Sequence, residues 1–204
     1  YPMPPAKILE IIQNGTVIPA CPLALNSRRE FDTRRQTALM RYYCDAGAGG
    51  VAVAVHTTQF EIRKPEFSLF EPVLLVCSEA IDSWVAQNGR PVVKIAGIVG
   101  KTEQAIREAE SAAAHGYHIG LLSLSAFKGA ALNEMITHAE AVASRIPLFG
   151  FYLQPSVGGR ILPFAFWKRF CKIPNVVAIK IAPFNRYQTI DVARAVAESG
   201  REHE

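Results

Sequence analysis

The chain has 204 residues, of which 50% are hydrophobic and 20% are charged, a balance typical of one folded globular domain. Its 22 basic and 18 acidic residues give a net charge of +4 and are spread along the sequence, which argues against a nucleic-acid or membrane-surface role. No apolar run reaches the roughly 18 residues that are needed to span a bilayer.

The cysteines indicate a reducing compartment. Four cysteines lie far apart, without a C-x-x-C pair, and the opening segment YPMPPAKILE lacks the apolar core of a secretory signal. We therefore expect reduced, mostly buried thiols in a cytoplasmic protein.

Six apolar runs predict buried β-strands, and amphipathic patterns between them predict helices. The strands are expected at residues 16–25, 50–56, 91–98, 119–126, 147–153 and 176–183. The helices are expected at residues 32–47, 71–89, 102–116, 133–146, 163–170 and 188–199. Asp32 and Thr102 are the expected N-caps of two helices, and Gly89 is expected to end a third.

Strict alternation of strands and helices predicts a parallel sheet with right-handed crossovers. Either a (β/α)8 TIM barrel or an open doubly wound sheet would satisfy this order. The glycine cluster at 45–50 precedes a strand, whereas a Rossmann fold needs G-x-G-x-x-G directly after one, so the barrel is favoured. Only about six of the eight units are present, and we expect residues 1–204 to form a single, incomplete barrel domain that stops before strand seven.

Lys180 stands inside the apolar run NVVAIKIAPF, and a buried strand does not tolerate an ammonium group without a reason. Ala178 and Ala182 share its side of the strand and leave room for a long side chain. A structural lysine paired with a buried carboxylate is the alternative, but none of the six predicted strands contains Asp or Glu. Desolvation would lower the lysine pKa from about 10.4 toward neutrality, and the neutral amine is the nucleophile that forms a Schiff base with a carbonyl substrate.

Lys94 is the competing strand lysine. It comes early in its strand, so we expect its head group to reach solvent at the bottom of the barrel, away from the strand ends where barrel chemistry gathers. The close histidine pair His115 and His118 lies in the loop that leads into a strand, at that same end. No metal site is therefore predicted.

Two other strand ends carry polar groups that suit an active site. Thr57 and Thr58 follow the strand at 50–56 and offer adjacent hydroxyl and backbone N–H groups that suit a carboxylate. Tyr152 stands near the end of the strand at 147–153 and is expected beside Lys180 of the neighbouring strand.

Together, the segments HTTQ, FYLQPSVGG and NVVAIKIA resemble the dihydrodipicolinate synthase and N-acetylneuraminate lyase family of class I aldolases. The likeness runs in order from residue 16 to the end of the chain. It implies a (β/α)8 barrel, a homo-oligomer, no cofactor, and a Schiff base between Lys180 and pyruvate or a related 2-oxo acid. It also implies that Tyr152 is a proton shuttle oriented by Thr57, and that Thr57 and Thr58 bind the substrate carboxylate.

The sequence departs from the family pattern around the substrate. His56 and Gln59 stand where the family has glycines, which predicts a bulkier, hydrogen-bonding wall of the substrate-binding pocket. Phe127 or Lys128 replaces a tyrosine that a neighbouring subunit contributes in the family. Val157 replaces the arginine that holds a second carboxylate in the synthases, and Arg160 lies three positions further on. These changes argue against dihydrodipicolinate synthesis itself.

The expected activity is that of a class I aldolase or lyase that makes or breaks a carbon–carbon bond between a 2-oxo acid and an aldehyde. A dehydratase of a 2-oxo sugar acid on the same scaffold is one alternative, and a catalytically silent, ligand-binding remnant is another. In each case the partners are small molecules, not nucleic acid or membrane.

Overall fold

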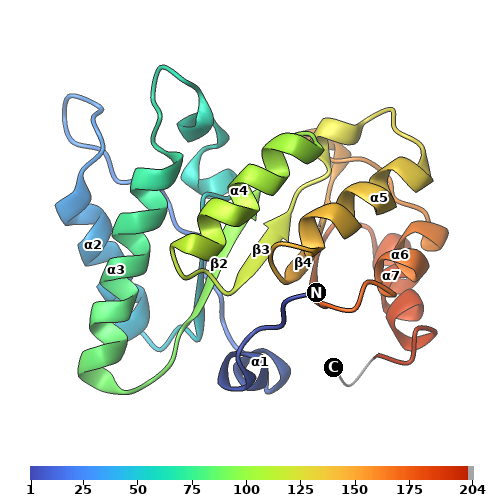
Figure 1. The fold of residues 1–204 in the computed structure, drawn as a ribbon, viewed down its shortest axis with the longest axis horizontal. Coiled ribbons are helices and arrows are strands. Elements are labelled where there is room, and N and C mark those ends of the chain that lie inside the picture. The colour runs from blue at the N-terminus through green and yellow to red at the C-terminus, as the bar shows by residue number, and fades with distance from the viewer. Residues whose placement is uncertain (202–204) are drawn as a thin grey trace. The chain divides into compact units, whose positions relative to one another are not determined.

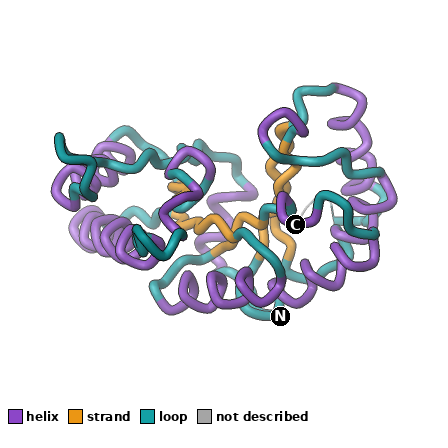
Figure 2. The backbone as a smooth tube through the Cα atoms, turned by 90° about the horizontal axis from the view of Figure 1, so that it is seen from above, coloured by secondary structure: helices purple, strands orange, loops and turns teal. Residues whose placement is uncertain are grey.

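The computed structural model describes residues 1–201, which divide into two compact units. The N-terminal unit comprises residues 4–97 and 111–119. The C-terminal unit comprises residues 1–3, 98–110 and those from 120 onward. Strands and helices alternate along the chain, as Figure 1 shows, and Figure 2 distinguishes them by colour.

The N-terminal unit contains two parallel strands and the helices that flank them. Strand β1 pairs with β2, with Gly50 opposite Val93 and Val53 opposite Ala96. Helices α2 and α3 lie side by side (Figure 1). The elements are α1 (Ala6–Gln13), α2 (Thr33–Asp45), β1 (Gly50–Val53), the 3₁₀ turns η1 (His56–Thr58) and η2 (Phe60–Arg63), α3 (Phe70–Asn88) and β2 (Val93–Ile98).

Local sequence signals set several helix ends. The Asp32 carboxylate accepts a hydrogen bond from the Arg35 N–H at 2.9 Å and caps α2, as predicted. Gly89 ends α3 in the left-handed conformation at φ 70°, which glycine adopts without steric cost. Thr102 is the first residue of α4 (Thr102–Ala114) and not its N-cap, so that prediction was wrong by one position.

The first predicted strand, at residues 16–25, is reduced to two isolated bridges, a parallel one between Ala20 and Ala52 and an antiparallel one between Leu25 and Phe31. Two hydrogen bonds flank the parallel bridge, from the Cys21 N–H to the Ala52 carbonyl and from the Ala52 N–H to the Pro19 carbonyl. Pro19 and Pro22 have no N–H, so the segment cannot form a regular ladder. Over residues 1–201 there are therefore five strands, where six were predicted.

The C-terminal unit is built on parallel strands β3, β4 and β5, with β4 pairing to both neighbours. Helices α6 and α7 lie side by side on this unit (Figure 1). Its elements include β3 (Ile119–Leu122), the 3₁₀ turn η3 (Ser125–Phe127), α5 (Leu132–Ala143), β4 (Leu148–Leu153), the 3₁₀ turn η4 (Pro155–Val157), α6 (Phe164–Phe170), β5 (Val176–Ala182) and α7 (Arg186–Ala197).

The two faces of this sheet have different neighbours. A Cβ added to Gly150 would lie 2.7 Å from the Phe170 ring of α6, so the face that carries Gly150 packs against the helices. Side chains alternate along a strand, so Phe151 lies on the opposite face, here called the inner face. The register places Phe151 opposite Lys180, which puts Lys180 on the inner face as well.

The predicted α/β fold, in which parallel strands alternate with helices, is confirmed. Helix α1 was not predicted, because its short apolar pattern sits among prolines at residues 2, 4 and 5. Among the residues that the structure describes, no helix is both long and apolar enough to cross a membrane.

Candidate active site

Lys180 is the reactive amine of the candidate site. Its Nζ lies 5.0 Å from the centroid of the Phe151 ring, and it makes no hydrogen bond or ion pair with any residue in the described part of the chain. Partial desolvation lowers the pKa of Lys180. A larger fraction of this amine is therefore neutral and nucleophilic at a given pH than for a fully solvated lysine.

Lys94, the competing lysine, is held in a structural ion pair. It is 4% exposed, and its Nζ donates to the two carboxylate oxygens of Asp82 at 2.6 and 2.7 Å and to the Ser78 hydroxyl at 2.9 Å. The prediction that its head group reaches solvent was wrong, because helix α3 supplies a carboxylate that no strand contains. With three polar partners at its ammonium group, Lys94 is a poor nucleophile.

His118 also serves the structure of the N-terminal unit. Its Nδ1 accepts the Lys94 backbone N–H at 3.0 Å. Burial, reinforced by the nearby Lys94 charge, lowers the pKa of His118 to about 4, so the ring is neutral at physiological pH. In the residues that the structure describes, no cluster of three or more His, Cys, Asp or Glu side chains is placed to hold a metal ion.

Tyr152 does not lie beside Lys180, contrary to the sequence prediction. It follows Phe151 on β4 and so points to the helix side, where it is fully buried 5.1 Å from Trp167 between ring centroids. Its hydroxyl donates to the Leu162 carbonyl and accepts from the Leu162 N–H, both at 3.2 Å. Burial raises the pKa of Tyr152, so the phenol stays protonated.

The predicted carboxylate-binding loop forms η1 in the N-terminal unit, whereas Lys180 belongs to the C-terminal unit. Thr58 is buried, its hydroxyl donates to the Cys21 carbonyl at 2.6 Å, and its N–H bonds to the Val55 carbonyl. Both of its donors are therefore engaged within the fold, which does not support a carboxylate contact from Thr58.

The rest of this loop is open to a ligand. His56, Thr57 and Gln59 are exposed, and the Thr57 hydroxyl has no hydrogen-bond partner in the described part of the chain. The His56 ring meets Phe60 edge-on at 5.5 Å. Gln59 adopts φ 82°, a strained conformation for a residue other than glycine.

Arg63 was not predicted from the sequence, and it fixes the ends of β1 and β2. Its Nη2 donates to the Ala54 carbonyl at 3.0 Å and to the Gly97 carbonyl at 2.8 Å, and its guanidinium lies 4.6 Å from the Phe70 ring centroid. A Cβ at Gly97 would approach the Ala54 carbonyl oxygen to 2.4 Å, so only glycine fits there. In the sequence, Gly97 was the only local sign of this close approach between the ends of β1 and β2.

Arg160, three positions beyond the family's second-carboxylate arginine, takes a structural role. Arg160 donates through Nη1 to the carbonyls of Phe127 and Ala130 at 2.6 and 3.0 Å and so ties down the loop after β3. The Phe127 ring is buried against His138, 4.3 Å between centroids. Val157 is 41% exposed and offers no charge.

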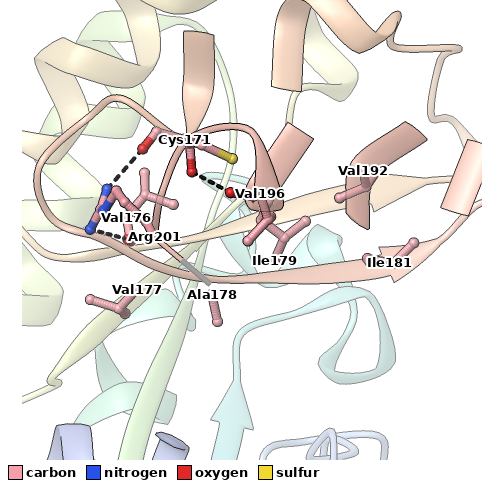
Figure 3. Close-up of a pocket in the computed structure, with 10 residues that line it drawn as sticks. Cys171, Val176, Val177, Ala178, Ile179, Ile181, Val192, Val196 and Arg201 are labelled. Carbon is pink, nitrogen blue, oxygen red and sulfur yellow. Dashed lines mark hydrogen bonds between the residues drawn. The ribbon is translucent and has the colours of Figure 1, made fainter. Parts of the chain in front are cut away.

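A separate cavity of about 200 Å³ lies between β5 and α7 (Figure 3). Apolar side chains such as Ile179, Val192 and Val196 line it, and Arg201 closes one end by donating to the carbonyls of Cys171 and Ile173. Lys180 is not among the lining residues. The cavity therefore lies outside the candidate site.

Comparison with solved structures identifies the fold. YagE, a prophage protein of the dihydrodipicolinic acid synthase family from E. coli K12 in complex with pyruvate, matches with a TM-score of 0.78 and 17% identity over 91% of this chain and 60% of its own. The N-acetylneuraminate lyase from Mycoplasma synoviae matches with a TM-score of 0.71 and 14% identity, over 89% and 59%. A dihydrodipicolinate synthase from Cyanidioschyzon merolae with lysine bound matches with a TM-score of 0.76 and 22% identity, over 90% and 60%.

The chain has the fold of the dihydrodipicolinate synthases and N-acetylneuraminate lyase. The fold class is that of a TIM barrel, and the chain spans about 60% of the length of the solved structures that it matches. No protein-family model matches the sequence, and no curated protein does so either.

Proposed function

We propose that the chain carries the Schiff-base lysine of a class I aldolase or lyase that acts on a 2-oxo acid. The observation that carries this proposal is the Lys180 amine, which lies on the inner face of β5 with a lowered pKa and without a polar partner among the described residues. Lys180 is exposed in the structure, so the prediction that its strand buries it was wrong. A lysine with a lowered pKa and no paired carboxylate is nevertheless a candidate functional residue.

The chemistry needs only the amine and the substrate. The neutral Lys180 amine adds to the C2 carbonyl of the 2-oxo acid, and loss of one water gives a protonated imine. When the C3–C4 bond breaks, the C4 hydroxyl gives its proton to water and becomes the carbonyl of the released aldehyde, while the electron pair of the broken bond passes into the imine and forms an enamine. Protonation at C3 and hydrolysis by water then return free Lys180 and the shortened 2-oxo acid, and the reverse sequence makes the bond.

The choice of substrate class draws on the sequence resemblance and on the comparisons. YagE, which shares the fold, was solved with pyruvate, the smallest 2-oxo acid that this chemistry can use. The resemblance alone assigns Thr57, His56 and Gln59 to contacts with the substrate, and within the N-terminal unit all three are exposed at the end of β1. The geometry of Tyr152 does not support its predicted role as the proton shuttle.

The deciding experiment is reductive trapping. Incubation with pyruvate and borohydride should add one covalent group, which peptide mapping by mass spectrometry should locate at Lys180. Lys180→Met should abolish the adduct, and Lys94→Met is the matched control, because it removes the other strand lysine and leaves the exposed Asp82 carboxylate in contact with water. No adduct with a panel of 2-oxo acids, or an adduct on Lys94, would refute the proposal.

Turnover separates an enzyme from a silent ligand-binding chain, which is the alternative that the sequence leaves open. An aldolase should release an aldehyde repeatedly from a suitable 2-oxo acid. A silent chain should instead retain a stoichiometric, reducible adduct without product.

A further inference from the structure

The tripeptide Gln-Asn-Gly occurs twice in the N-terminal unit, each time at the end of a helix. Residues 13–15 end α1, and residues 87–89 end α3. An asparagine side chain loses its amide most readily before glycine, because glycine has no Cβ to hinder the approach of its backbone nitrogen to the asparagine Cγ. Asn14 and Asn88 are both exposed, so contact with water does not distinguish them.

Hydrogen bonds hold Asn88 in place. Its Nδ2 donates to the Trp84 carbonyl at 2.9 Å, and the N–H of Gly89 donates to the Val85 carbonyl at 2.8 Å. The side chain of the next residue, Arg90, donates to two further backbone carbonyls of the same unit. For the Gly89 nitrogen to attack the Asn88 side chain, both the amide bond to Trp84 and the backbone bond to Val85 must first break.

Asn14 is held less firmly. It is the C-cap of α1, and its side-chain amide has no hydrogen-bond partner in the described part of the chain. The Gly15 N–H makes one bond, to the Ile12 carbonyl three residues back, and at 3.1 Å this bond is longer than that of Gly89. Helix α1 has 8 residues against 19 in α3, and the ends of so short a helix open easily. The Gly15 nitrogen is therefore free to react more often than that of Gly89.

We propose that Asn14 is a site of spontaneous modification, at which the side-chain amide is lost and a mixture of aspartate and isoaspartate forms. The Gly15 nitrogen gives its proton to water and attacks the Asn14 Cγ. The bond between Cγ and the amide nitrogen breaks, this nitrogen takes up a proton and leaves as ammonia, and a cyclic imide remains. Water then opens the imide: cleavage between the Gly15 nitrogen and Cγ gives aspartate, and cleavage at the backbone carbonyl carbon gives isoaspartate. Only water is consumed, and the reaction is independent of the chemistry proposed for Lys180.

The modification is expected to loosen α1. Isoaspartate carries the main chain through the former side chain and so lengthens it by one methylene group between α1 and Thr16. A Cβ on Gly49 would lie 1.9 Å from Thr16 Oγ1 and 3.1 Å from Ile11 Cγ2, so both ends of this connection pack directly against the backbone where β1 begins. Either product also places a carboxylate at the C-terminal end of α1, where the helix dipole disfavours a negative charge.

The test follows the full chain at neutral pH and body temperature. Peptide mapping by mass spectrometry locates each lost amide, and enzymatic methylation of isoaspartate reports the imide route. In the folded chain Asn14 should be modified about ten-fold faster than Asn88, the scale of breaking one or two further hydrogen bonds. In denaturing urea the two rates should become similar, because the tripeptides are identical, and a difference that persists in urea would overturn the structural reasoning.

Asn14→Gln is the matched variant, because glutamine keeps the amide and closes a cyclic imide far more slowly. It should remove isoaspartate at this position and leave the rate at Asn88 unchanged. Asn14→Asp reproduces one product, and it should speed hydrogen exchange of the α1 amides while those of α3 stay unchanged. The proposal is refuted if the folded chain modifies Asn14 no faster than Asn88, or if Asn14 yields aspartate without isoaspartate.

Discussion

Replacing Tyr152 by phenylalanine is expected to weaken the fold and to leave the chemistry of Lys180 nearly intact. The substitution keeps the ring that packs against Trp167 and removes only the hydroxyl. That hydroxyl is both donor and acceptor for the backbone of Leu162, ten residues further along the chain, and so closes the loop that follows β4. Tyr152 and Leu162 are both buried, so no water replaces the lost partner.

The size of the effect follows from the groups left unpaired. Tyr152→Phe leaves the Leu162 N–H and carbonyl without their side-chain partner, which costs about 1 to 3 kcal/mol of unfolding free energy. With a urea m-value of about 2 kcal/mol/M, the unfolding midpoint should fall by roughly 0.5 to 1.5 M at constant m. The rate of borohydride trapping by pyruvate should change less than about ten-fold, because the hydroxyl faces away from Lys180.

Tyr187→Phe is the matched control in the same unit. Tyr187 is 66% exposed, and its hydroxyl meets only the Arg186 guanidinium at 3.4 Å, so its loss should change stability by less than about 0.5 kcal/mol. The opposite result for Tyr152→Phe would overturn the reasoning. Unchanged stability with trapping or turnover slowed by about 10² to 10⁴ would restore Tyr152 as the proton shuttle that the family resemblance implies.

Three further predictions concern charge. Asp82→Asn should lower the free energy of unfolding by about 1 to 2 kcal/mol in urea titrations, because the buried Lys94 ammonium loses its charged partner, while trapping at Lys180 stays unchanged. The rate of imine formation should rise with pH as Lys180 loses its proton, and the midpoint of this rise should lie below the ordinary lysine pKa of about 10.4, because desolvation lowers the pKa of Lys180. A pH–rate profile with its midpoint at or above about 10.4 would contradict this. In a condensation assay with pyruvate, aspartate semialdehyde should be a poorer acceptor than an uncharged aldehyde, because Val157 cannot pair with a carboxylate, and equal or faster reaction would refute it.

Sequence patterns predicted the elements whose signals are local. The helix at 71–89 is observed as α3 (Phe70–Asn88), because apolar periodicity and the Gly89 stop specify it. The strand at 176–183 is observed as β5 (Val176–Ala182), because a continuous apolar run that ends at Pro183 specifies it. Lys180 was found for the same kind of reason, since a charge inside an apolar run is visible without knowledge of the fold. The prediction of a strand at 16–25 was wrong because it gave more weight to the apolar content than to the two prolines. In the structure, the missing proline N–H groups prevent a regular ladder of hydrogen bonds.

The partners of side chains could not be predicted, because they depend on register and on distant segments. Lys94 pairs with Asp82, which a helix brings to it from twelve residues earlier. Tyr152 and Phe151 are neighbours in sequence, and only the pairing of β4 with β5 determines which of them shares a face with Lys180.

The β5 strand that carries Lys180 is also predicted to be the point at which this 204-residue chain associates with itself. Among the described residues β5 pairs only with β4, so beyond Val176, whose carbonyl accepts from Arg201, its other edge has no strand partner. Ile181 on this strand is 39% exposed. Ile181→Lys places a charge on that edge and should shift the chain toward monomer in sedimentation velocity runs at several concentrations. Val17→Lys is the control, because Val17 is an exposed apolar residue (72%) outside β5. If the unmodified chain is monomeric at every concentration, or if both lysine variants shift the monomer fraction equally, the open edge of β5 is not the site of association. The β5 strand then holds Lys180 in place without a second strand paired to that edge.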